Sequence, residues 1–453
     1  MRASWVFFAV IIHAVSSSKL GEQCSLNGHW ANALCQCDPG WKGSSCAELD
    51  LVPASPSSYG LTDFDTPSWG GGAVWVASEN KWHLIVGSRA AAPPNNSDAL
   101  ADYPCDSRVV RAVSKGSDPA GPYSIEQVMF HRSTWEPGLA AAPTTMGGNS
   151  TLPLVLMFFG NLSDSIPPLF STACAIPSVE YNLTTTNTYI TTSATGSPRG
   201  PWTTPQLVKG MENDPLSTRN GRSKDPYSWH CASGNPSPAY HPNGTLYAAM
   251  RQNPCWKGYQ TREHIGLWRA DNGWDGDWTL VSTGEPLFGW GDAGGSERNC
   301  TDANACPCHE DPHLWIDERG FHLLTHDQNN HKIHSTRGAY GWSLDGLAWV
   351  LETLPTMGNS SAWAMDLRWA NGTTTPLVRK QRVSLVRDPV TGWPTHTING
   401  ADFNTHLPPS KGSCEGCHWG QGFTLVQPLG NGSNAPEVAR ARLIFPACTD
   451  AGP

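Results

Sequence analysis

The sequence predicts an all-β fold, a five-bladed β-propeller that follows a small N-terminal module. Gly and Pro are frequent, 45 and 37 of 453 residues, and no stretch shows a sustained helical stripe. Both observations favour short strands joined by many turns. A strand–turn–strand pattern also recurs five times, at intervals of roughly 80 residues. Each repeat continues with a third strand and an aromatic fourth strand, and five units of four strands make such a propeller. A pair of β-sandwiches stays open as the alternative.

The N-terminus has the composition of a secretory signal peptide over residues 1–16. Arg2 supplies a positive charge, an apolar run extends from Trp5 to Val15, and Ala14-Val15-Ser16 offers small residues for cleavage. The run is too short to span a bilayer, which takes about 20 residues; an uncleaved anchor is the alternative. We therefore expect a secreted, extracellular protein without a membrane span.

Charge and sequons agree with this expectation. The formal net charge is −9, and a nucleic-acid partner, which needs a basic face, is not expected. Nine Asn-x-Ser/Thr sequons predict a glycoprotein. They lie at Asn95, Asn149, Asn161, Asn182, Asn243, Asn299, Asn359, Asn371 and Asn431.

Four cysteines within residues 21–48 predict the N-terminal module. They are Cys24, Cys35, Cys37 and Cys46, and so short a segment needs staples because it cannot bury its own core. The Cys-x-Cys pair, with a later cysteine after Gly-Trp-x-Gly, resembles the second half of an EGF-like module. The resemblance implies the disulfides Cys24–Cys35 and Cys37–Cys46, and a spacing or docking role with a protein partner. A zinc site is the competing interpretation.

The propeller is expected over residues 55–453, with blades that open near residues 69, 143, 236, 312 and 383. The first strand of each blade lines the central funnel, so the residues that open the repeats are expected to converge there. Sugar rings stack on aromatic faces, and a few polar groups orient them. The candidate substrate-binding residues are Trp69, His313, Trp315, His322 and Arg382.

One repeat carries a specific motif. Residues 309–314, His-Glu-Asp-Pro-His-Leu, and the following Gly-Phe-His-Leu-Leu resemble a strand pair of family 43 glycoside hydrolases, the five-bladed arabinanases and xylosidases. The resemblance implies that Glu310 is the general acid. The family places an Asp where this chain has Asn235, and that Asp orients the acid and tunes its pKa. The family's general base, an Asp that opens the first blade, has no counterpart in register; Asp65 or Asp63, a few residues upstream, is the candidate replacement.

Neither a metal site nor another cofactor is expected, although a single structural cation in the propeller centre, held by His326 or Asp327, is an open alternative. Histidines are crowded between residues 309 and 334 without the spacing of a metal motif. The ten cysteines of the propeller are interpreted as disulfides, because secretion favours them over zinc ligands or a redox pair.

Two functions from different classes remain. The first is a secreted glycoside-hydrolase-like propeller that hydrolyses glycosidic bonds in a polysaccharide, with Glu310 as acid. The second is a carbohydrate-binding, lectin-like or extracellular matrix protein without catalysis. Inverting hydrolysis needs two carboxyl groups about 6.5–9.5 Å apart. Glu310 and Asp311 are adjacent and would face opposite sides of a regular strand, so they are not expected to act together.

Overall fold

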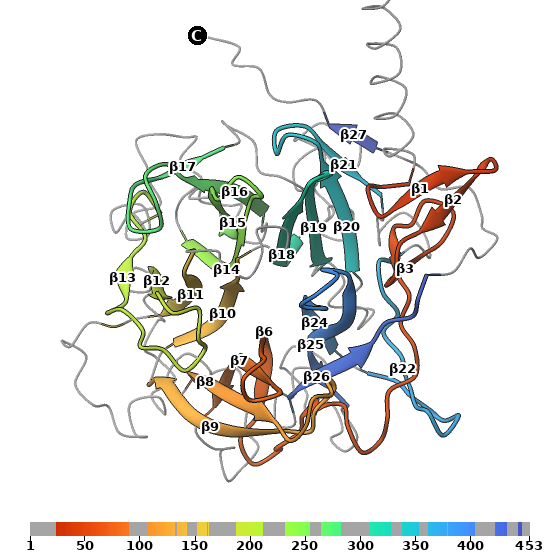
Figure 1. The fold of residues 1–453 in the computed structure, drawn as a ribbon, viewed down its shortest axis with the longest axis horizontal. Helices are drawn as coiled ribbons and strands as arrows, with labels where there is room; N and C mark the ends of the chain where they lie inside the picture. Colours follow the sequence, from red (N-terminus) through yellow and green to blue (C-terminus); the bar gives the residue numbers. More distant parts are fainter. Residues whose placement is uncertain are drawn as a thin grey trace, which may run out of the picture.

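Five antiparallel sheets, four of them with four strands and one with five, surround a central axis in the computed structural model (Figure 1). It describes residues 24–89, 107–131, 134–142, 152–160, 162, 187–211, 232–253, 264–281, 309–327, 338–352, 361–377, 379–403, 422–432 and 443–445. None of these residues is helical. The prediction of an all-β, five-bladed propeller is therefore confirmed.

Each blade is an antiparallel meander whose first strand lies nearest the axis (Figure 1). The first blade contains β6 (Ser68–Val76), β7 (Lys81–Arg89), β8 (Ser107–Ser114) and β9 (Tyr123–Phe130), and the second contains β10 (Thr134–Ala140), β11 (Leu154–Gly160), β12 (Asn187–Ser193) and β13 (Gln206–Leu207). The third contains β14 (Ala232–Tyr240), β15 (Leu246–Asn253), β16 (His264–Ala270) and β17 (Trp278–Leu280), and the fourth contains β18 (His309–Asp317), β19 (Gly320–Asp327), β20 (Gly338–Ser343) and β21 (Trp349–Leu351).

The fifth blade closes the ring with a strand from the other end of the chain. Its own strands are β24 (Arg379–Arg387), β25 (Pro394–Asp402) and β26 (Phe423–Pro428), and β5 (Gly60–Leu61) pairs with β26. A further strand, β27 (Leu443–Phe445), extends the fourth blade beside β21. A short hairpin of β22 (Leu367–Arg368) and β23 (Thr374–Thr375) lies between these two blades in the chain.

The core consists of apolar layers between neighbouring blades. Strand β11 is buried along its whole length, because both of its faces are covered. Its Val155 and Met157 join Ala248, Met250 and Trp268 of the third blade in one cluster. Many of the tryptophans serve such layers, which is why the high Trp count is weak evidence for a sugar site.

A β-bulge interrupts the innermost strand at the same place in every blade. In β6, for example, Trp69 pairs with Gly87 and Gly72 with Ile85, so two residues oppose one. The first bulged residues are Gly70, Glu136, Asn235, Asp311 and Arg382, and all five have φ between 48° and 59°. A bulge re-aims the side chain that it carries and disturbs the regular alternation of faces.

The second blade begins earlier than the sequence pattern suggested. Its innermost strand is β10, so Pro143, which was expected to open the blade, follows that strand. Pro137 is the residue equivalent to Pro236 and Pro312, because each follows the first bulged residue. The predicted start near residue 143 was wrong because β11 is strongly apolar and the start of the blade was expected directly before it. The innermost strand, β10, is less apolar.

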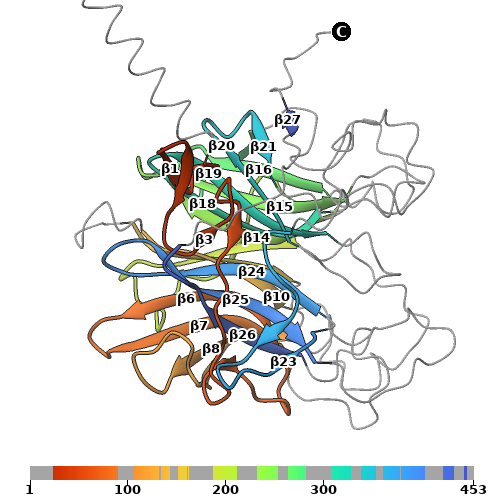
Figure 2. The ribbon, with the colours of Figure 1, turned by 90° about the vertical axis from the view of Figure 1, so that its right-hand side faces the viewer.

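The N-terminal module packs firmly on the fourth and fifth blades (Figures 1 and 2). It contains β1 (Gly28–Ala31), β2 (Leu34–Cys37), β3 (Trp41–Lys42) and β4 (Glu48–Leu49). The disulfides Cys24–Cys35 and Cys37–Cys46 are present as expected.

Aromatic packing joins the module to the propeller. Trp41 is 2% exposed and stacks on Trp315, with 5.8 Å between ring centroids. The Tyr340 hydroxyl donates to the carbonyl oxygen of Ser25 (2.7 Å), and Arg319 forms an ion pair with Asp38. The module is therefore a fixed part of the structure. No helix in the described ranges is long and apolar enough to cross a membrane.

Candidate functional site

The five bulges bring a group of charged side chains together around the axis. Gly70 contributes no side chain, but the other four positions carry Glu136, Asn235, Asp311 and Arg382. Asn and Asp tolerate a positive φ better than Glu and Arg do. Non-Gly residues held in this conformation cost of order 1–3 kcal/mol each and occur most often at functional sites. The side chains of all four are largely buried.

Asp311 lies at the centre of the group. One of its oxygens accepts a hydrogen bond from Nδ2 of Asn235 and lies 3.7 Å from Nη1 of Arg382. Its other oxygen lies 3.0 Å from Nδ1 of His326. These contacts hold the pKa of Asp311 below its ordinary value, against the effect of burial, and His326 makes the largest favourable contribution. The contacts therefore favour the ionised form of Asp311.

Glu310 faces the same histidine. Its Oε2 lies 3.3 Å from Nε2 of His326, and its Oε1 accepts hydrogen bonds from Arg251 and, at 3.4 Å, from Asn235. The expectation that Glu310 and Asp311 face opposite sides was wrong, because the bulge at Asp311 breaks the alternation. Both carboxylates contact one imidazole ring, which raises the pKa of His326 to about 10 despite its burial.

Glu136 is the third carboxyl group of the cluster. Its Oε2 accepts a hydrogen bond from the backbone amide of Asn235 (3.1 Å) and lies 3.8 Å from Nη1 of Arg382. Burial raises the pKa of Glu136 to about 7, and Arg382 and Arg251 only partly offset that effect. Glu136 and Asp311 therefore have pKa values displaced in opposite directions within one site.

These two groups have a partner in common. Oε2 of Glu136 and Oδ1 of Asp311 lie 3.8 and 3.7 Å from Nη1 of Arg382, so the two carboxyl groups belong to one site and share one cation. A pair of carboxyl groups with divergent pKa values is the usual arrangement of an acid and a base.

Glu310, Asp311 and His326 also have ligand atoms within 4.8 Å of one another. A metal ion would need neutral imidazole nitrogen as a donor. Here each ring nitrogen of His326 faces a carboxylate, Nδ1 that of Asp311 and Nε2 that of Glu310. With Arg251 and Arg382 beside the same oxygens, the positive charge is supplied by the protein itself. The oxygens of Glu310 and Asp311 are thus paired with cationic side chains of the protein.

Three of the residues expected at the funnel lie in the cluster, namely Glu310, Asn235 and Arg382. The bulge position of the first blade is Gly70, so this blade supplies no carboxylate there. Asp65 is exposed in the turn before β6, where its amide donates to Asp63 (3.1 Å).

His313 lies next to the cluster, at a small cavity. The cavity has a volume of 70 Å³ and is also lined by Asp311 and Arg382. Nε2 of His313 accepts a hydrogen bond from the amide of Leu385 (3.1 Å) on the fifth blade. Burial lowers the pKa of His313 to about 3, so the ring is neutral and acts as an acceptor.

The structure places the other three candidates in packing positions. Trp315 and His322 stack on each other (4.7 Å between centroids) beneath the N-terminal module, and His322 contacts Tyr340 and Asp317. Trp69 is 5% exposed and packs over Gly400 of the fifth blade. Their rings are covered by protein groups, so a sugar could not stack on them in this conformation.

Sequence reasoning missed Glu136 and Arg251. The dipeptide Glu136-Pro137 is the signal that could have revealed the first, since Asn235-Pro236 and Asp311-Pro312 share its form. Arg251 lies on β15, and only strand pairing opposite Gly234 brings it to Glu310. No sequence signal identifies it.

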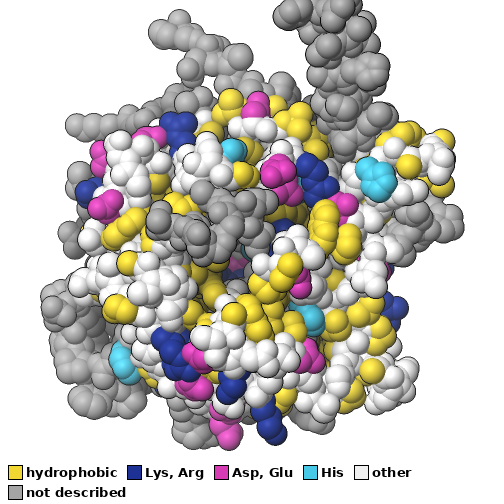
Figure 3. Space-filling model, in the orientation of Figure 1, with side chains coloured by type: hydrophobic (Ala, Val, Ile, Leu, Met, Phe, Trp, Pro, Cys, Tyr) yellow, Lys and Arg dark blue, Asp and Glu magenta, His cyan; other side chains and the backbone are white. Residues whose placement is uncertain are grey.

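The asparagines of three sequons, Asn243, Asn371 and Asn431, are among the described residues, and all three are exposed. The other six, Asn95, Asn149, Asn161, Asn182, Asn299 and Asn359, lie outside the described residues, as do residues 1–16 and the ten propeller cysteines. Acidic and basic side chains are interspersed on the face shown in Figure 3, without a continuous basic patch.

No protein-family model and no curated protein matches the chain. Solved structures do. A family 117 glycoside hydrolase from the marine bacterium Zobellia galactanivorans is 12% identical, with 84% of this chain and 89% of that chain covered and a TM-score of 0.46. A xylan β-1,4-xylosidase from Bacillus halodurans C-125 is 12% identical, with 84% and 59% covered and a TM-score of 0.43. An exo-1,5-α-L-arabinanase from a bovine ruminal metagenomic library is 11% identical, with 81% and 95% covered and a TM-score of 0.42.

Proposed function

We propose that the protein is a secreted glycoside hydrolase, with Glu136 as the proton donor and Asp311 as the carboxylate that activates water. The observation that carries the proposal is the pair of pKa displacements, upward to about 7 for Glu136 and downward for Asp311, at two carboxyl groups that share Arg382. Near neutral pH the first can hold a proton while the second stays ionised.

The proposal changes the role first assigned to Glu310. A general acid must have its proton directed at the leaving oxygen, whereas both oxygens of Glu310 face donors on Arg251, Asn235 and His326. Glu310 is better suited to position His326, whose positive charge favours the ionised form of Asp311. Asn235 links the three carboxyl groups, because its amide nitrogens contact all of them.

The proposed chemistry balances without a cofactor. Glu136 transfers its proton to the glycosidic oxygen as the bond to the anomeric carbon breaks, while Asp311 takes a proton from the attacking water. Attack from the opposite face inverts the anomeric configuration. The substrate is a polysaccharide. With Glu136 protonated, the two carboxylates and three cations of the cluster leave a single positive charge.

Three features support secretion. The signal-like N-terminus and the sequons belong to an extracellular protein, and the two disulfides of the module suit an oxidising compartment. The N-terminal module is proposed to add a protein-docking surface.

The test is a screen of polysaccharides and aryl glycosides with the wild-type protein, Glu136→Gln and Glu310→Gln. Glu126→Gln is the control, because it removes a half-exposed carboxylate of the outermost strand β9, which pairs with Arg111 and Arg199 of the first two blades. We expect Glu136→Gln to lower kcat by about 10²–10⁴-fold, as for other general acids. NMR of the initial product gives the anomeric configuration. Full activity of Glu136→Gln, together with loss of the alkaline limb of the pH profile in Glu310→Gln, would show that Glu310 and not Glu136 is the general acid.

A carbohydrate-binding protein without catalysis is the second candidate. It is favoured by Gly70, which leaves the first blade without a carboxylate, and by the complete pairing of charges within the cluster. Glycan-array binding that persists in Glu136→Gln, without turnover by the wild type, would establish this function.

A further inference from the structure

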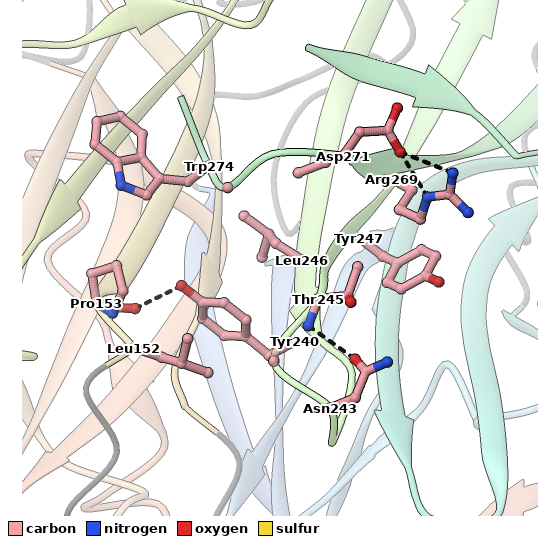
Figure 4. Close-up of a pocket in the computed structure, with 13 residues that line it drawn as sticks. Leu152, Pro153, Tyr240, Asn243, Thr245, Leu246, Tyr247, Arg269, Asp271 and Trp274 are labelled. Carbon is pink, nitrogen blue, oxygen red and sulfur yellow. Dashed lines mark hydrogen bonds and ion pairs between the residues drawn. The ribbon is translucent and has the colours of Figure 1, made fainter. Parts of the chain in front are cut away.

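A large cavity lies at the opposite end of β14 from the charged cluster. Asn235 stands near the start of this strand, and the cavity begins at Tyr240, where the strand ends. It has a volume of 970 Å³, at the upper end of the range of small-molecule sites. Leu152 and Pro153 of the second blade and Trp274 of the third blade line one side of it, with Trp274 above the other two in the view (Figure 4).

The asparagine of a sequon, Asn243-Gly244-Thr245, forms part of the cavity rim (Figure 4). The turn that carries it is well defined, because the amide of Gly244 donates to the carbonyl of His241 and the amide of Asn243 to the ring of His241. Oδ1 of Asn243 accepts a hydrogen bond from the amide of Thr245 (3.0 Å). The oxygen is thereby held to the turn, and Nδ2 of this exposed side chain is presented outward.

We propose that an N-linked oligosaccharide on Asn243 occupies this cavity, with its first sugar rings packed between the second and third blades. The inference rests on passage through a glycosylating secretory pathway, which is part of the proposed function; it does not need hydrolase activity. In the covalent step, a lipid-linked oligosaccharyl pyrophosphate is the donor. The bond from its anomeric carbon to the pyrophosphate oxygen breaks, a bond to Nδ2 forms, Nδ2 loses a proton, and the lipid pyrophosphate leaves.

The lining of the cavity suits sugar rings. Trp274 and Tyr247 are half-buried and offer amphipathic ring surface, and Leu246 forms an apolar floor. The ring of Tyr247 is braced by Phe321 of the fourth blade, edge to face at 5.2 Å. Rigid aromatic surface of this kind can receive a sugar with little loss of side-chain entropy.

The charges of the cavity also favour a neutral ligand. Arg269 and Asp271 form an ion pair at its edge (2.9 Å), so their charges cancel. Their remaining nitrogen and oxygen atoms can form hydrogen bonds with the hydroxyl groups of a sugar. The Tyr240 hydroxyl donates to the carbonyl of Pro153 (3.0 Å), which fixes the two blades relative to each other beneath the ligand. A neutral chain attached at the rim is the occupant that these features fit.

The chain offers a matched control in Asn371. It belongs to an identical Asn-Gly-Thr sequon in the turn between β22 and β23, and its Oδ1 accepts from the amide of Thr373 at the same 3.0 Å. Both turns carry a glycine with φ near +90°, Gly244 and Gly372. The two sites differ in surroundings, because an atom added at Gly372 would meet nothing within 4 Å, whereas Gly244 approaches Leu152 of the cavity wall.

The experiment uses the full chain secreted from a eukaryotic cell. Glycopeptide mass spectrometry gives occupancy, and timed treatment of the folded protein with an amidase that removes N-glycans gives the release rate at each site. We expect occupied Asn243 to be released at least tenfold more slowly than Asn371, and both to be released at the same rate after denaturation. Trp274→Ala should abolish most of this difference while occupancy of Asn243 is unchanged.

Stability gives an independent readout. Thr245→Ala, which removes the sequon but keeps Asn243, should lower the Tm by a few degrees when the protein is made in the glycosylating host. The same variant made in a host without N-glycosylation should match its wild type, and Thr373→Ala should be neutral in both. An unmodified Asn243, or equal release rates at the two sites in the folded protein, would overturn the proposal.

Discussion

Replacement of Glu136 by Gln tests the electrostatics of the funnel without any knowledge of the substrate. Burial raises the pKa of Glu136 from the ordinary 4.5 to about 7. The folded protein therefore binds this proton more tightly than the unfolded chain does. Stability from this group is full below about pH 4.5, declines as the pH rises to about 7, and stays constant above. Gln cannot ionise, so the variant lacks this decline.

The magnitude follows from the displacement of about 2.5 pKa units. At 1.36 kcal/mol per unit, ionised Glu136 costs about 3 kcal/mol of folding free energy at pH 8 relative to pH 4.5. The group is 14% exposed, so solvent screening reduces this figure little. For a chain of this length the corresponding shift in Tm is about 4 °C.

The assay is thermal unfolding of the wild type and Glu136→Gln between pH 4.5 and 9, followed by tryptophan fluorescence. Protonated His326, with a pKa raised to about 10, stabilises the fold, and this contribution is lost as the pH rises from the pKa of an unfolded histidine to about 10. Ionised Asp311, with a lowered pKa, also stabilises the fold, and its contribution is lost only at acidic pH. Both are present in the two proteins, so the difference in Tm reports Glu136 together with its interaction with Asp311 and Glu310. We expect the difference to move by about 4 °C in favour of the variant between pH 4.5 and 8. A difference that stays flat over this interval would refute the raised pKa of Glu136.

Three further predictions concern the cluster and the module. Arg251→Met leaves Glu310 without its guanidinium partner and should lower stability by about 3–5 kcal/mol, as for other broken buried pairs, measured by chemical unfolding; a loss below 1 kcal/mol would contradict the buried pairing. Asn235→Asp places a fourth carboxyl group against Glu310 and Asp311, so its Tm should fall more at pH 8 than at pH 5; an equal fall at both would speak against charge repulsion. Trp41→Ala empties a site that is 2% exposed and should cost about 3–5 kcal/mol and speed proteolysis within the module, and an unchanged cleavage rate would mean that the module is held by other contacts.

Local patterns in the sequence predicted the fold class and the number of blades. Turn residues and alternating apolar runs identify strand pairs, because the order of apolar and polar residues along a strand indicates which of its faces is buried. The disulfides of the module were also predictable through its resemblance to a known spacing, and Cys24–Cys35 and Cys37–Cys46 close loops within one short segment. The same patterns placed the start of the second blade near residue 143, which was wrong. Strand β11 is strongly apolar and is easily recognised, whereas β10, the innermost strand before it, is less apolar.

The composition of the charged cluster was decided by tertiary structure. Glu310, Asn235 and Arg382 could be nominated from the sequence because they open repeats. Arg251 could not, because its place depends on strand pairing. The assignment of Trp315 and His322 to a sugar site did not anticipate the module that covers them.

The sequence by itself determined the number of blades, the stapled module and the region of the funnel, since these follow from local hydrophobic periodicity, turn residues and cysteine spacing. Only the tertiary structure decided which carboxyl groups share a site and which of them can hold a proton. The physical reason is that five bulges turn side chains from separate blades inward, and desolvation and charge act on a group through its neighbours in space. Glu136 has a raised pKa and Asp311 a lowered one because of those neighbours.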